Sequence, residues 1–135
     1  MTNEANKALM RRYHAAWSAG DTDQLRQMLA EDCVTHNLVT GEKRPVEFEV
    51  EACRIWHESF SGVAVNIEQL VAEADRVTVC WRLHSIHSAE FLGIPATNQA
   101  VLVPGLEINR IAAGKIAEIW RLSDTFSLMQ QLGAV

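Results

Sequence analysis

The spacing of apolar residues changes along this chain, from helical periodicity in its first half to strict alternation in its second. Three segments, at residues 3–20, 22–29 and 45–62, place their apolar side chains three or four positions apart, as amphipathic helices do. The first and third end at a glycine, the residue that most often follows a helix. The pattern therefore predicts three helices before the main run of strands.

Alternating segments follow, and alternation is typical of strands with one buried face. Strands are predicted at residues 33–37, from 63 to a turn at 73–76, and at 77–87, 106–111 and 115–124. Residues 88–99, with Gly93, Pro95 and Asn98, interrupt the strands, and a short helix closes the chain. We therefore expect residues 1–135 to form one α+β domain, in which a curved, mainly antiparallel sheet wraps over three N-terminal helices.

Composition narrows the range of functions. The 135 residues carry a net charge of -5 and no cluster of basic residues, which argues against a nucleic-acid partner. No apolar run approaches the ~18 residues of a membrane span, and the polar first ten residues do not resemble a signal peptide. Three widely spaced cysteines (Cys33, Cys53 and Cys80) fit reduced thiols of a cytoplasmic protein better than a disulfide framework.

The last predicted strand suggests a catalytic group. Alternation places Trp120, Leu122 and Asp124 on one face of that strand. If this face lines a cavity, the apolar surroundings raise the pKa of the Asp124 carboxyl and make it a usable general base. Asp124 is also a good N-cap for the tail helix, and that structural role is the alternative.

Other polar residues could share the cavity. His36, Arg82 and His84 are candidates for polarising a substrate carbonyl, although Arg82 and His84 could equally face solvent or a subunit interface. Glu107 falls opposite Trp120 in the simplest hairpin register, but a bulge near Gly114 would shift the pairing by one residue and turn Glu107 to the other face.

Several ring-bearing residues could line the same pocket or belong to the core. These are Tyr13, Trp17, Trp56 and His57. His84 and His87 lack the spacing of a metal-binding pair, and no serine lies in a nucleophile-elbow motif, so neither a metal site nor an acyl-enzyme hydrolase is expected.

Two motifs carry a family resemblance. The loop His-Ser-Ala-Glu-Phe-Leu-Gly-Ile-Pro-Ala-Thr-Asn-Gln at residues 87–99 resembles that of the SnoaL-like polyketide cyclases, the ester cyclase group. So does the hairpin of residues 108–124, which is followed by Gln131-Leu132-Gly133. The resemblance implies the cone-shaped α+β barrel of the nuclear-transport-factor-two-like superfamily, an apolar pocket, and dimers or tetramers formed through the outer face of the sheet.

The resemblance also implies a reaction. In those cyclases an aspartate, matched here by Asp124, removes an acidic proton from a polyketide methylene, and an intramolecular aldol addition closes a ring. Such chemistry requires no metal or redox cofactor, because a methylene between two carbonyls is already acidic. The expected partner is therefore a small apolar or polyketide-like molecule bound near Trp120 and Leu122. An epoxide hydrolase with two carboxylates flanking an arginine, an isomerase, and a binding module without catalysis are the alternatives.

Overall fold

The first half of the chain forms helices close to the predicted positions. In the computed structural model, which describes residues 2–135, α1 spans Asn3–Ala19, α2 spans Thr22–Met28 and α3 spans Val46–Ser59. The first two helices are capped by Thr2 and Asp21, because these side chains accept hydrogen bonds from backbone N–H groups of the first turn.

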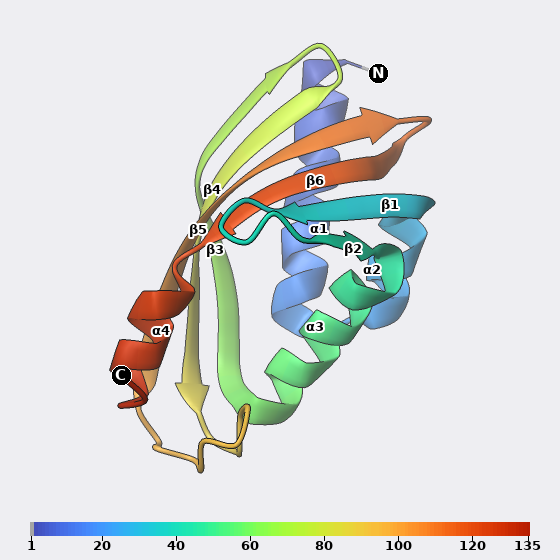
Figure 1. Ribbon diagram of the computed structural model, residues 1–135. Coiled ribbons are helices and arrows are strands. Elements are labelled where there is room, and N and C mark those ends of the chain that lie inside the picture. The colour runs from blue at the N-terminus through green and yellow to red at the C-terminus, as the bar shows by residue number, and fades with distance from the viewer. Residues whose placement is uncertain (1) are drawn as a thin grey trace.

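Six strands form one open, strongly curved sheet (Figure 1). They are β1 (Leu29–Asn37), β2 (Lys43–Pro45), β3 (Phe60–Glu73), β4 (Arg76–His87), β5 (Ala100–Ala112) and β6 (Lys115–Ser123), in the spatial order β2-β1-β6-β5-β4-β3. All neighbours are antiparallel except β1 and β6. The predicted α+β class and mainly antiparallel sheet are confirmed. The sequence missed the short β2 and placed the start of β5 too late.

The core lies between the sheet and the helices. Helix α1 packs along β3 and β4, and α3 packs against β1 and β3. Along β4, Val77, Val79, Trp81 and Leu83 are buried on this inner face, whereas Arg82 and His84 alternate with them and are exposed. Odd and even positions of β4 therefore point to opposite faces of the sheet, one toward the core and one toward solvent.

A bulge in the last hairpin determines which side chains of β6 face the core. The pairing of β5 with β6 shifts between Arg110, which faces Glu118, and Ile111, which faces Ile116. Ala117 is thus an extra residue on β6. Beyond the bulge, Glu107 lies opposite Arg121 rather than Trp120. The sequence allowed two registers for this hairpin, and the structure has the bulged one.

Side chains of the two family-like motifs hold the segments that follow β4 and β6 by hydrogen bonds. After β4, the backbone N–H of Thr97 donates to Nδ1 of His87 at 3.2 Å and holds the 88–99 loop. The tail helix α4 (Thr125–Gln131) packs against β5, where the Gln131 side chain pairs with both backbone polar groups of Leu102 at 2.8 Å. Among residues 2–135, no helix combines the length and hydropathy needed to cross a membrane.

Candidate active site

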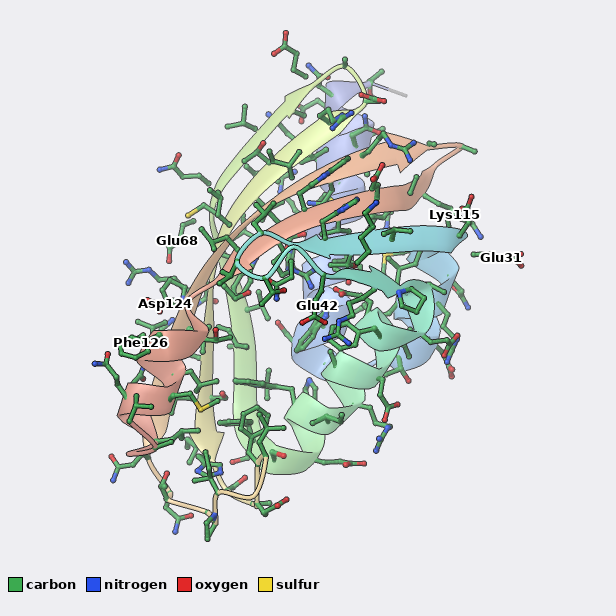
Figure 2. All side chains as sticks on the ribbon, in the orientation of Figure 1. Glu31, Glu42, Glu68, Lys115, Asp124 and Phe126 are labelled. Carbon is green, nitrogen blue, oxygen red and sulfur yellow. The ribbon has the colours of Figure 1, made fainter. Side chains whose placement is uncertain are left out.

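The structure does not place Asp124 in an enclosed pocket. Its side chain is exposed at the start of α4, where it accepts a hydrogen bond from the backbone N–H of Ser127 at 2.9 Å (Figure 2). The expected apolar surroundings are therefore absent around this carboxylate, and the expected placement was wrong. The geometry matches the N-cap alternative instead.

Five further candidates lie on the outer face of the sheet. The rings of His36 and Trp120 stack there with centroids 5.2 Å apart, and Leu122 is 45% exposed. Arg82 and His84 are also exposed on this face. The cause is the bulge, because it turns Trp120 and Leu122 outward and Ile119 and Arg121 inward. The expectation that the Trp120 face lines the cavity was therefore wrong.

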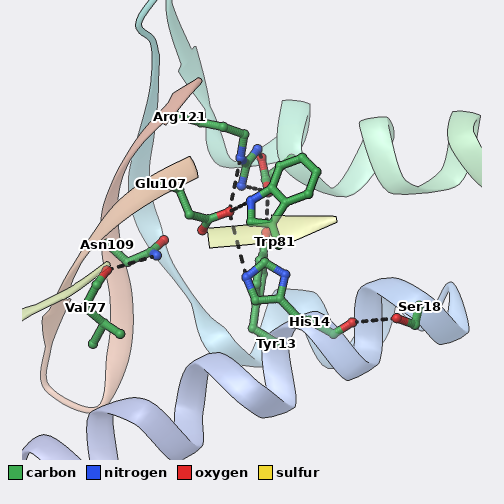
Figure 3. Close-up of polar contacts among 9 residues, drawn as sticks. Tyr13, His14, Ser18, Val77, Trp81, Glu107, Asn109 and Arg121 are labelled. Carbon is green, nitrogen blue, oxygen red and sulfur yellow. Dashed lines mark hydrogen bonds and ion pairs between the residues drawn. The ribbon is translucent and has the colours of Figure 1, made fainter. Parts of the chain in front are cut away.

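A largely buried polar cluster lies instead between the inner face of the sheet and the helices α1 and α3 (Figure 3). Its members are Tyr13, His14, Glu49, Trp81, Glu107, Asn109 and Arg121. Glu107 and Asn109 are adjacent inward positions of β5, and they are 1% and 0% exposed. Arg121 reaches Glu107 from β6, with its Nε 3.4 Å from Oε1 of the carboxylate. Two of the predicted residues, Glu107 and Tyr13, are thus brought together inside the molecule.

Arg121 lies between two carboxylates. It donates two hydrogen bonds to Glu49 of α3, at 2.7 and 2.8 Å, and faces Glu107 on its other side. Burial alone would raise the pKa of Glu49, but the charge and hydrogen bonds of Arg121 outweigh burial and lower it. Tyr13 donates its hydroxyl hydrogen to Glu49, and burial together with this carboxylate raises the pKa of Tyr13. Glu49 is therefore a fixed anion whose charge Arg121 balances.

Trp81 fixes the orientation of Glu107. Its indole N–H donates to Oε1 of Glu107 at 2.8 Å. The ring can lie flat across β5 because Gly105 is its cross-strand partner, and a Cβ at that position would come within 2.1 Å of the indole. A glycine in mid-strand here serves a close approach of the ring.

Glu107 and His14 retain unused polar atoms. Oε2 of Glu107, Nε2 of His14 and Oδ1 of Asn109 are buried without a hydrogen-bond partner. Nε2 of His14 lies 3.8 Å from Oε1 of Glu107. Burial lowers the pKa of His14, more than the nearby Glu107 raises it, so the imidazole is neutral near pH 7.

His14 connects the cluster to the surface. Together with Arg11 and Ala15 of α1 and residues 65–70 of β3, it lines a groove of about 510 Å³. Glu107 does not line the groove, but its Oε1 lies 3.8 Å from Nε2 of His14, which does.

The remaining ring-bearing candidates have structural contacts. Nε2 of His57 donates to the backbone carbonyl of Trp17 at 2.7 Å, and the same imidazole packs on Gly20, which ties α3 to the end of α1. Trp17 is half-buried beside it. Trp56 is buried in a separate aromatic group with Phe60 and Phe91. Among residues 2–135, no group of three or more potential ligands could hold a metal ion.

Sequence reasoning missed His14, Glu49 and Arg121. His14 follows Tyr13 on a helix whose apolar stripe was assigned from other residues, and Glu49 lies one position before the apolar Val50. The only signal in the sequence is a charged residue next to the apolar stripe of a helix. This signal indicates a buried site only when a partner of opposite charge is found. That partner, Arg121, is identified only through the bulged register of β6.

Comparison with known proteins finds one family and many similar structures. The family model described as SnoaL-like polyketide cyclase matches residues 7–132. TsrD from Streptomyces laurentii is 26% identical, with a TM-score of 0.88 over 100% of this chain and 99% of its own. IdmH from Streptomyces antibioticus, a proposed polyketide cyclase, is 26% identical, with a TM-score of 0.84 over 95% of this chain and 98% of its own.

A third similar structure is AclR from Streptomyces galilaeus, a proposed hydroxylase. It is 24% identical and has a TM-score of 0.91 over 99% of this chain and 88% of its own, which supports the fold alone. No curated protein sequence matches the chain.

Proposed function

Because the chain belongs to the SnoaL-like polyketide cyclase family, we propose that it catalyses proton transfer on a small carbonyl compound, with Glu107 rather than Asp124 as the general base. The observation that carries the proposal is the buried carboxylate of Glu107, whose Oε2 has no hydrogen-bond partner and whose Oε1 lies 3.8 Å from the unpartnered Nε2 of His14. A base in this position is shielded from water, and its neighbour His14 lines the groove in which a substrate could bind.

The other members of the cluster hold the base in place. Trp81 and Arg121 both approach Oε1 of Glu107, which leaves Oε2 without a partner and free to accept a proton. Glu49 accepts two hydrogen bonds from Arg121 and balances its charge. The neutral imidazole of His14 can donate an N–H to the substrate oxygen.

In the proposed reaction, Oε2 of Glu107 removes a proton from a methylene between two carbonyls. The electron pair of that C–H bond forms an enolate, whose oxygen His14 stabilises. The enolate carbon then attacks a second carbonyl carbon of the same molecule, a C–C bond closes the ring, and the alkoxide takes back the proton from Glu107. No oxidant or reductant is consumed.

The test is proton exchange of a β-diketone in D₂O, followed by NMR. Glu107→Gln should lose about 10²- to 10⁴-fold in exchange rate, the usual contribution of a positioned base. The amide is isosteric and can still accept from Trp81, so the fold should survive. Asp124→Asn is the matched control and should stay close to the wild type. If Asp124→Asn abolishes exchange while Glu107→Gln retains it, the base is the aspartate and the proposal fails.

One observation favours a second function. Arg121 between Glu49 and Glu107 is the arrangement of two carboxylates about an arginine that water activation against an epoxide requires. Epoxide hydration without diketone exchange would support this hydrolase. Exchange without hydration supports the cyclase-type reaction.

A further inference from the structure

Arg11 contributes a positive charge to the groove between α1 and β3. It lies three positions before His14 on α1, so both side chains project from the same face of the helix, and both line the groove. Glu68, the acidic residue of the lining, is 3.7 Å from Arg82 of the outer face. The imidazole of His14 is neutral near pH 7. Within the described lining, Arg11 is therefore the charge that lacks a counter-ion.

The other arginines show that this position is unusual in the chain. Within residues 2–135, every arginine other than Arg11 and Arg12 forms an ion pair with a glutamate or an aspartate. No acidic residue lies three or four positions from Arg11 along α1, where a helical partner would stand. Arg12 is exposed and does not line the groove. The guanidinium of Arg11 is therefore free to bind an anion that enters the groove.

The rest of the lining suits the carbon skeleton of a small molecule. Its apolar side chains are Ala15, Val65, Ile67 and Leu70. The volume of about 510 Å³ lies in the range of ordinary small-molecule sites. At 1.5 Å per residue, Arg11 and His14 are about 4.5 Å apart along the helix axis. A short ligand can therefore place an anion at Arg11 and a carbonyl oxygen at His14 at the same time.

We infer that Arg11 is a specificity-determining residue, which selects substrates that carry a carboxylate a few bonds away from the reacting carbonyl groups. A guanidinium can donate two parallel hydrogen bonds to a carboxylate, and this geometry orients the ligand as well as attracting it. With its carboxylate at Arg11, the ligand brings its carbonyl end to His14, whose Nε2 is 3.8 Å from Glu107. The inference rests on the proposed function for the reaction, but its test measures binding separately from turnover.

The probes are 4,6-dioxoheptanoate and its methyl ester, which share a methylene between two ketones and differ in the charge of the acid group. In ¹H–¹⁵N NMR titrations of the whole protein near pH 7 and at low salt, the acid should bind about fivefold more tightly than the ester, the upper range for an exposed ion pair. Arg11→Met should abolish this preference and leave binding of the ester unchanged. Arg12→Met removes the same charge from the neighbouring exposed position, and it should keep the preference.

Salt and kinetics give two further measurements. High salt should reduce the preference of the wild type for the acid, because an exposed ion pair is screened. In the exchange assay, Arg11→Met should raise KM for the acid about fivefold and leave kcat unchanged, since Arg11 acts on binding and not on proton transfer.

Equal affinities of the wild type for the two probes overturn the inference, as does the failure of both probes to bind at millimolar concentration. A preference that persists in Arg11→Met, or that Arg12→Met loses to the same extent, also overturns it. Failure of the proposed function is a separate outcome. A wild type that prefers the acid but does not exchange its methylene protons supports Arg11 and contradicts the base, whereas exchange of both probes with equal KM contradicts Arg11 alone.

Discussion

At the scale of single residues, the interior depends on one cation. Arg121 is the group that keeps Glu49 ionised inside the protein, through two hydrogen bonds and a full charge. A buried ion pair adds little stability by itself, but removal of one partner leaves the other charge uncompensated.

Arg121→Met should therefore destabilise the protein by about 3–5 kcal/mol at pH 7, measured by chemical denaturation. Arg82→Met, at an exposed position of the outer face, is the control and should change stability by less than about 0.5 kcal/mol. Equal stability of the two variants would contradict the importance of the buried pair.

The same pair predicts a pH dependence with a definite sign. Because the pKa of Glu49 is lowered on folding, its contribution to stability is present above the unfolded value of 4.5 and is lost as the pH falls through the lower folded value. In Arg121→Met, burial without the cation raises the pKa of Glu49. The loss of stability relative to the wild type should therefore shrink as the pH falls and Glu49 becomes protonated. A deficit independent of pH between 7 and 4 would show that lost packing, rather than charge, is the cause.

At the scale of elements, the tail helix completes the sheet. Strand β6 ends at Ser123, so the part of β5 before Gly105 has no strand on that side. The Gln131 side chain fills this place: its Nε2 donates to the carbonyl of Leu102, and its Oε1 accepts from the Leu102 N–H. The family-like Gln-Leu-Gly motif thus has a structural explanation, with Leu132 buried and Gly133 at a positive φ of 76°.

Gln131→Ala should cost about 1–2 kcal/mol, since both hydrogen bonds to the β5 edge are lost. Faster amide hydrogen exchange at Leu102 should accompany the loss. Gln130→Ala, an exposed neighbour on the same helix, should leave both quantities unchanged. If Leu102 exchanges at the same rate in the two variants, α4 does not protect this edge.

At the scale of the whole molecule, part of the outer face of the sheet is apolar and exposed. Leu106, Ile108 and Leu122 are 45%, 40% and 45% exposed, and Leu106 and Leu122 are cross-strand neighbours. A contiguous apolar patch of this kind marks an interaction surface.

We therefore expect a homodimer formed through this face, as the family resemblance also implies. Light scattering coupled to size-exclusion chromatography should give a dimer for the wild type and a monomer for Leu106→Lys or Leu122→Lys. Leu92→Lys, at a loop position that is 71% exposed, should remain dimeric. A wild type that is monomeric at micromolar concentration would refute this assembly.

The sequence by itself determined most of the elements and, for most strands, which side chains share a face. Helical spacing identified α1 and α3, and alternation correctly opposed Val77, Val79 and Trp81 to Arg82 and His84 on β4. These are local properties, because the repeat of a helix or strand fixes which side chains share a face. The family-like motifs were likewise visible in the chain.

Only the tertiary structure decided which face of β6 is inside, and with it the candidate site. One extra residue at Ala117 reverses the parity, so that Trp120 and Leu122 face outward and Arg121 meets Glu49 and Glu107. A period-two pattern cannot distinguish the two faces when both carry apolar residues. The pairing of charges from α3, β5 and β6 depends on contacts between residues 72 positions apart in the chain, which no local pattern encodes.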